Sequence, residues 1–174
     1  MTSSTTEFDQ GRVRDLDGRA WHPWTRRALI ALMTLFVVIG LTGAFGQVQH
    51  TRTASTAAAL VKVRTPETLR GGLYWPTEIR IDAHQRITAP TIVLGSGFIR
   101  GMQLNTVEPA PASESSRGGR VALTYPTLEP GDALVVHLQL QVNPTTVGEQ
   151  DLGVRIDGAD LPPIALPQTA TVLP

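Results

Sequence analysis

The sequence contains no cysteine among its 174 residues. This absence excludes disulfide frameworks, thiol nucleophiles, cysteine-ligated zinc and iron–sulfur clusters, although it does not report the cellular compartment. An excess of charge of one sign is also missing, because 15 basic residues balance 15 acidic ones, and this excludes a polybasic nucleic-acid-binding protein. Aromatic residues make up only 5% of the chain, whereas there are 16 glycines and 13 prolines. This composition is typical of a turn-rich β domain rather than of a helical one.

One uninterrupted apolar run is present, at residues 28–45, and it contains no charged residue and no Asn, Gln, His or Pro. A helix of this length covers about 27 Å, close to the hydrocarbon thickness of a bilayer. Its Leu, Ile, Val and Phe residues favour membrane insertion by a few kcal/mol on an insertion scale of about −0.3 to −0.6 kcal/mol each. A buried core helix would need a large helical surround, which the rest of the sequence does not offer. The sequence therefore predicts a transmembrane helix at 28–46.

The charges that flank this run predict its orientation. Basic residues follow it sparsely, at Arg52, Lys62 and Arg64. Five arginines precede it, namely Arg12, Arg14, Arg19, Arg26 and Arg27. Basic flanks stay in the cytoplasm, and Trp21 and Trp24 lie where indole rings prefer the headgroup layer. We therefore expect a single-pass protein of the cell membrane with a cytoplasmic N-terminus and an extracytoplasmic C-terminal domain.

A cleaved signal peptide is the alternative interpretation of the same run. Ala44, Phe45 and Gly46 fit a small-x-small cleavage site after an apolar stretch. Signal h-regions are typically about 7–15 residues long, shorter than this run, and their positive leaders are shorter than residues 1–27. The retained anchor is therefore preferred, whereas cleavage would give a mature N-terminus near Gln47.

The remaining sequence divides by composition. Residues 1–27 carry scattered charges of both signs without an apolar period, so we expect a disordered cytoplasmic tail. Residues 47–58 are polar and rich in small side chains, which is typical of a linker. Residues 59–174 are enough for one domain with its own core.

Period-two alternation dominates this last segment. It is clearest at residues 133–142 (ALVVHLQLQV), which put Leu and Val on one face and Val135, His137, Gln139 and Gln141 on the other. Further strands are expected at 77–83, 120–125 and 152–157, and weaker ones at 60–65, 91–94, 102–107 and 164–173. Residues 110–119 are expected to form a polar loop and residues 129–132 a type II turn. Seven to eight short strands predict an all-β fold, an antiparallel immunoglobulin-like β-sandwich.

A family resemblance rests on the run LEPGDALVVHLQLQVNPTTVGEQDLGVRID, at residues 128–157. In it a Leu-x-Pro-Gly turn leads into a long alternating strand and then into a glycine-containing return strand. This run resembles the closing half of bacterial cell-surface immunoglobulin-like modules of the CARDB and NPCBM-associated kind. The wider layout is similar to a group of actinobacterial single-pass membrane proteins, with an Arg/Trp-flanked anchor before the β domain. The resemblance implies a fold and a placement, and it supplies no catalytic residues.

The sequence predicts no catalytic, cofactor-binding or metal-binding residues and no cofactor. The histidines His22, His50, His84 and His137 lack metal-ligand spacing, and His137 beside a carboxylate of a neighbouring strand is at most half of a dyad. Ser96 lies between Gly95 and Gly97, but the nucleophile elbow needs glycine at both second neighbours. A calcium ion held by turn acids is a minor alternative. Those acids are Asp132, Glu149, Asp151, Asp157 and Asp160.

Three functional hypotheses follow. The leading one is a non-catalytic interaction or accessory module of the cell envelope, with the lipid bilayer and another membrane or envelope protein as partners and with neither nucleic acid nor a small-molecule substrate. The second is a cell-wall glycan-binding module, motivated by the aromatic pair Tyr74 and Trp75, although Trp75 is expected to fill the core. The third, an envelope hydrolase, lacks a recognisable nucleophile–base pair.

Overall fold

The computed structural model describes residues 22–41 and 48–174, which belong to two separate compact units, Met1–Gly46 and Gln47–Pro174. The first unit contributes one helix, α2 (His22–Leu41), which has neither an acidic first turn nor a basic last turn. Its stretch Pro23–Leu41 is long and apolar enough to cross a membrane, and its side chains are exposed on every side. By length and composition this helix is compatible with a membrane span or with a signal sequence near the N-terminus.

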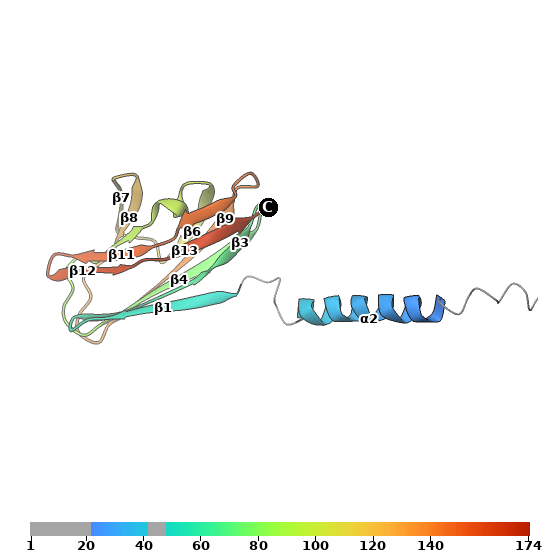
Figure 1. The fold of residues 1–174 in the computed structure, drawn as a ribbon. Helices are drawn as coiled ribbons and strands as arrows, with labels where there is room; N and C mark the ends of the chain where they lie inside the picture. Colours follow the sequence, from blue (N-terminus) through green and yellow to red (C-terminus); the bar gives the residue numbers. More distant parts are fainter. Residues whose placement is uncertain (1–21, 42–47) are drawn as a thin grey trace, which may run out of the picture. The chain divides into compact units, whose positions relative to one another are not determined.

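The second unit consists mostly of antiparallel β-sheets, and strands make up 55% of the structure (Figure 1). One five-stranded antiparallel sheet has the order β1-β2-β4-β9-β6. Its strands are β1 (Gln49–Ser55), β2 (Ala59–Pro66), β4 (Tyr74–Ala83), β9 (Ala133–Val142) and β6 (Met102–Glu108). A second five-stranded antiparallel sheet has the order β12-β11-β5-β8-β7. Its strands are β12 (Leu161–Leu166), β11 (Val154–Gly158), β5 (Thr91–Leu94), β8 (Arg120–Thr124) and β7 (Ser113–Arg117).

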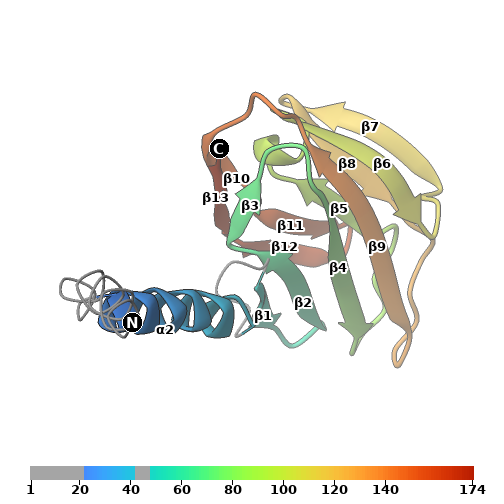
Figure 2. The same ribbon diagram turned by 90° about the vertical axis from the view of Figure 1, so that its right-hand side faces the viewer.

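A third, smaller sheet closes one side of the domain. Its strands are β10 (Gly148–Asp151), β13 (Thr169–Leu173) and β3 (Thr68–Arg70), which lie side by side in Figure 2. The last strand, β13, pairs antiparallel with β10 and parallel with β3, so the end of the chain is held between two segments distant in sequence. A single-turn 3-10 helix, η2 (Ser96–Phe98), connects β5 to β6.

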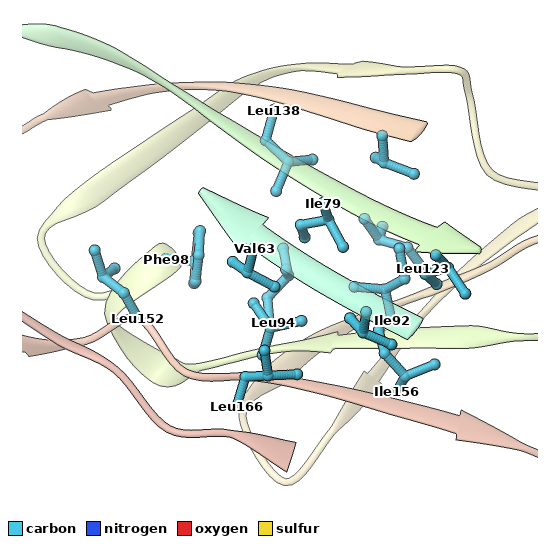
Figure 3. Packing of buried hydrophobic residues seen from close by; sticks show 14 of the residues in the cluster. Val63, Ile79, Ile92, Leu94, Phe98, Leu123, Leu138, Leu152, Ile156 and Leu166 are labelled. Atoms are coloured by element: carbon cyan, nitrogen blue, oxygen red, sulfur yellow. The ribbon is translucent and has the colours of Figure 1, made fainter. Parts of the chain in front are cut away.

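The core lies between the two five-stranded sheets. Val63, Ile79 and Leu138 project from the first sheet toward Leu94 and Ile156 of the second (Figure 3). These residues are buried because period-two alternation turns every second side chain inward, as the burial patterns of β4 and β9 show. The apolar contacts of this sandwich-like packing supply the main favourable term for folding.

Aromatic side chains close one end of this core. Trp75 on β4 is 1% exposed and its ring centroid lies 6.0 Å from that of Phe98 in η2. The expectation that Trp75 fills the core is therefore confirmed. The expected type II turn is also present, because Gly131 has φ of 92° and the Asp132 amide donates to the Glu129 carbonyl at 3.0 Å.

The helix boundaries differ from those predicted. The sequence interpretation began the membrane helix at residue 28, whereas α2 begins at His22, so residues 22–27 belong to the helix and not to a disordered tail. Pro23 lies in its first turn, where a missing amide hydrogen costs nothing. The predicted end at residue 46, the cleavage site considered at residues 44–46 and residues 1–21 lie outside the described residues.

The strand number and two loop assignments were wrong. The described part of the β domain has thirteen strands rather than seven or eight. The predicted linker 47–58 contains β1, and the predicted polar loop 110–119 contains β7, which ends at a turn formed by Gly118 and Gly119 with φ of 57° and 74°. Both are edge strands whose side chains are mostly exposed, so they form through backbone pairing with β2 and β8 and need no apolar alternation.

Candidate functional site

The outer face of the sheet β1-β2-β4-β9-β6 carries the candidate site. Alternation on β4 turns Tyr74, Pro76 and Glu78 outward, while on β9 it turns His137 and Gln139 outward. Tyr74 is 57% exposed, whereas its neighbour Trp75 is buried. The aromatic pair seen in the sequence is therefore divided between the surface and the core.

A hollow of about 420 Å³ opens on this face, where β4, β9 and β6 lie next to each other. Its lining combines aromatic and other apolar residues with residues that carry amide, hydroxyl, imidazole and carboxylate groups. The lining residues are Tyr74, Trp75, Pro76, Thr106, Glu108, His137, Leu138 and Gln139. The register of β6 against β9 shifts between Leu104 and Thr106, beside the hollow. Such bulges bend a strand and redirect its side chains.

Ionisable residues form a row across four of the five strands of the sheet, β2, β4, β9 and β6. His137 is directly opposite Glu78 on β4 and Glu108 on β6, while Arg64 is opposite Glu78 on its other side. Thr51 completes the row on β1. Directly opposite residues have Cβ atoms about 4.5–5.5 Å apart, which is near enough for charges to interact. This row presents basic and acidic groups in alternation to any molecule that lies across the strands.

Only the position of His137 agrees with its interpretation as half of a dyad. Two carboxylates are opposite the imidazole, but no hydrogen bond or ion pair joins His137 to either among the described residues. A nucleophile activated by a base needs hydrogen-bond contact with that base. As it stands, the arrangement offers donors and acceptors for binding.

A tight ion pair extends the polar face along β4. The Arg80 guanidinium donates to both carboxylate oxygens of Asp82, with Nε–O distances of 2.8 and 3.1 Å. This hydrogen-bonded pairing lowers the pKa of Asp82 below its ordinary value and raises the pKa of Arg80. Lys62 is directly opposite Arg80 on β2, so this part of the face adds a second basic group.

Asp151 organises a junction elsewhere in the domain. Its carboxylate accepts hydrogen bonds from the amides of Ser96 (3.3 Å) and Gly153 (3.0 Å), and from Arg120 (3.1 Å). A Cβ atom at Gly97 would lie 2.6 Å from the Asp151 carbonyl oxygen. The Gly-Ser-Gly sequence at 95–97 is thus explained by close packing of η2 on β10, in keeping with its exclusion as a nucleophile elbow.

The acids considered for calcium belong to different elements, namely the turn before β9, strand β10 and the hairpin of β11 and β12. Asp132 accepts a hydrogen bond from the Glu129 amide within its turn, and Asp157 lies between Arg155 (2.9 Å) and Arg117 (3.5 Å). Among residues 22–41 and 48–174, no group of three or more His, Asp or Glu side chains has an arrangement that could hold a metal ion. Three of the four histidines are likewise dispersed, with His22 starting α2, His50 on β1 and His84 just after β4.

Thr106 and Glu108 were not identified as site residues from the sequence. Their strand, β6, lacks clear alternation, and its pairing with β9 joins segments about 30 residues apart in the chain, which local pattern does not report. The alternation of 133–142 did place His137 and Gln139 on the wet face, as observed.

Comparison with known proteins gives no functional assignment. No family model matches the sequence, and no curated protein matches it. Among solved structures, the macrocyclization catalyst AvmM of alchivemycin A biosynthesis is similar with 8% identity and a TM-score of 0.45, over 74% of this chain and 98% of that one. A non-cellulosomal cohesin from the hyperthermophilic archaeon Archaeoglobus fulgidus is similar with 11% identity and a TM-score of 0.40, over 62% of this chain and 86% of that one. Likeness at this level assigns neither an activity nor a ligand.

Proposed function

We propose that the protein is a single-pass membrane protein whose extracytoplasmic, immunoglobulin-like β domain binds another component of the cell envelope without catalysing a reaction. The observation that carries this proposal is the combination of one exposed apolar helix with a separate β unit whose outer sheet face is hollowed and polar. The helix anchors the chain, and the β domain presents the hollow formed over β4, β9 and β6.

The orientation of the anchor is supported by charge. Arg26 and Arg27 lie within the first turns of α2, and the Arg27 guanidinium lies 6.0 Å from the ring centroid of Trp24. Arginine next to the apolar segment favours the cytoplasmic side, and tryptophan favours the headgroup layer. This arrangement supports a cytoplasmic N-terminus and an extracytoplasmic β domain.

The absence of native cysteine makes the orientation directly testable. Ser116 is exposed in β7, so a Ser116→Cys variant should react with a membrane-impermeant maleimide in intact cells. Reaction only after cell lysis would contradict the proposed orientation. A mature protein that begins near Gln47 would show that the helix is a signal sequence instead.

The binding role is tested by purifying the full-length protein with its bound proteins from native membranes. A His137→Ala/Gln139→Ala variant removes two exposed side chains from the hollow, and a Ser113→Ala/Ser115→Ala variant is the matched control on the other sheet. Loss of a bound protein in the first variant alone supports the proposal. If wild type remains monomeric and carries no partner, or if both variants retain the same partner, the proposal fails.

A cell-wall glycan is the second candidate ligand. The observation in its favour is the exposed Tyr74 ring at the edge of a hollow lined by Gln139, Thr106 and Glu108. Aromatic rings cover apolar sugar faces, while amide and carboxylate groups bond to hydroxyls. A pull-down with purified envelope polysaccharide distinguishes the two candidates. Binding that is lost in Tyr74→Ala but kept in Tyr74→Phe would favour the glycan, and no binding by wild type would exclude it.

A further inference from the structure

The large hydrophobic side chains that the β domain leaves exposed lie at one end of it. Within residues 48–174, all six large hydrophobic residues that the structure leaves exposed belong to this end, and their exposed fractions range from 40% to 59%. We call this group the apolar tip. It consists of Val48, Leu73, Tyr74, Ile99, Val147 and Leu173.

Hydrogen bonds between loops hold the apolar tip together. The Gly71 amide donates to the Leu173 carbonyl (3.3 Å), and the Val142 amide donates to the Leu73 carbonyl (3.1 Å). The Thr146 hydroxyl donates to the Gly101 carbonyl (2.9 Å), which joins the loop carrying Val147 to the segment that follows Ile99. The apolar tip is therefore a built surface of the domain and not a set of independent loop ends.

The chain enters the domain at this same end. Strand β1 begins at Gln49 opposite Pro66, and it starts at the end where the C-terminus lies (Figure 1). Helix α2 ends at Leu41, so seven peptide units separate it from Val48. At no more than about 3.6 Å per residue, they span at most about 25 Å. If α2 crosses the bilayer, Val48, where the chain enters the apolar tip, therefore stays within about 25 Å of the end of the helix.

Two arginines near the apolar tip favour an anionic membrane surface. Arg70, the last residue of β3, and Arg100, in the segment that follows η2, are exposed near the apolar tip, and neither forms an ion pair with another residue in the described ranges. Acidic residues near this end include Glu149 on β10 and Glu67, which forms an ion pair with Arg52. Unpaired arginines next to exposed apolar side chains are attracted to anionic lipid headgroups.

We propose that the apolar tip docks onto the outer surface of the bilayer in which α2 is anchored, with Leu73, Tyr74 and Val147 in the headgroup region. This inference rests on the proposed membrane anchorage. A tether this short holds the tip at an effective concentration of about millimolar. A weak affinity for lipid is therefore enough to keep the apolar tip bound to the bilayer surface.

The test uses full-length protein reconstituted in vesicles of phosphatidylcholine and phosphatidylglycerol, with one cysteine introduced at a time. Val147→Cys carries an environment-sensitive fluorophore at the apolar tip. Asp160→Cys carries it in the exposed turn between β11 and β12, at the other end of the domain. Nitroxide-labelled lipids quench a fluorophore that enters the headgroup region, and we expect several-fold stronger quenching at position 147 than at position 160.

Matched charge variants test whether apolar contact is the cause. In the Val147→Cys protein, Leu73→Asp should reduce quenching to the level seen at position 160, because it puts a charge into the docked surface. Ser116→Asp adds the same charge in β7, away from the apolar tip, and should leave the quenching unchanged.

Failure of docking and failure of anchorage give different results. Release of the protein from membranes by alkaline carbonate would refute the anchorage. Protein that is retained, but is quenched equally at positions 147 and 160, would refute docking alone. A blue-shifted signal at position 147 that depends on the protein-to-lipid ratio, without lipid quenching, would mean that a second copy covers the apolar tip and would also overturn the proposal.

Discussion

Replacing Trp75 and Tyr74 one at a time separates the core role of one aromatic residue from the surface role of the next. Trp75 is 1% exposed and packs 6.0 Å from Phe98, whereas Tyr74 is 57% exposed. Truncation of a buried Trp to Ala costs about 3–5 kcal/mol, because burial is lost and a cavity remains. A surface substitution typically changes stability by no more than about 0.5 kcal/mol. We therefore expect Trp75→Ala to destabilise the domain severely and Tyr74→Ala to leave it nearly unchanged.

The expected loss is a large part of the total stability of a domain, which is typically about 5–15 kcal/mol. A Trp75→Phe variant refines the argument, since Trp75 Nε1 is buried and has no hydrogen-bond partner among the described residues. Phe retains a ring and removes that unsatisfied N–H group. Its free-energy cost should therefore be smaller than that of Trp75→Ala.

Urea unfolding of a soluble protein comprising residues 48–174, followed by circular dichroism, measures these differences. All residues of the core cluster lie in this segment, so its unfolding reports the core. A Trp75→Ala cost below about 1 kcal/mol, or a Tyr74→Ala cost that equals it, would refute the assignment of the two rings to core and surface.

Three further predictions concern packing and titration. Gly97→Ala should lower the free energy of unfolding by about 1–3 kcal/mol in the same assay, because its Cβ would lie 2.6 Å from the Asp151 carbonyl oxygen; an unchanged value would contradict the close packing. Arg80 lowers the pKa of Asp82 below its ordinary value of 3.8, so the stabilising contribution of that carboxylate is present above pH 3.8 and is lost as the pH falls below it. In a plot of the free energy of unfolding against pH, Asp82→Asn should therefore reduce the loss of stability at acidic pH. Burial raises the pKa of Tyr125 from 10.0 to about 12, so the stabilising contribution of its neutral phenol is present below pH 10 and is lost between pH 10 and 12. Tyr125→Phe should reduce this alkaline loss of stability. An ultraviolet titration of Tyr125 in a Tyr74→Phe variant, which leaves one tyrosine in the sequence, would contradict the burial effect if its midpoint were near 10.

The parts of the fold that were predictable are those where burial leaves a pattern in the sequence. Strand β9 shows full alternation because one face lies on the core and the other on solvent. Strands β1 and β7 were missed because edge pairing is made by backbone groups and leaves the side chains free to be polar. The three-residue β3 is too short to carry a period, and its parallel pairing with β13 joins segments about 100 residues apart.

The candidate site was likewise predictable only where a residue's position follows from alternation along its own strand. Alternation along single strands identified His137 and Gln139 as outward, and the size of its indole ring placed Trp75 in the core, where it lies. Bringing Glu108 opposite His137 depends on which strands are neighbours and on the register shift in β6. Neighbour choice comes from the packing of the whole domain, so no local pattern contains it.

Strand β1 also determines how the β domain would respond to a pulling force. It is the first strand after α2, and seven of its residues, Gln49 to Ser55, are in register with β2. If a bound partner is pulled away from the membrane, tension enters the domain through the start of β1. When the pull runs along the strand axis, the backbone hydrogen bonds between β1 and β2 are loaded together rather than one after another. Strands whose hydrogen bonds are loaded together resist rupture better than strands whose bonds break one after another. Strand β1, which lies in the segment predicted to be a linker, would therefore attach the domain to its anchor in a mechanically resistant way.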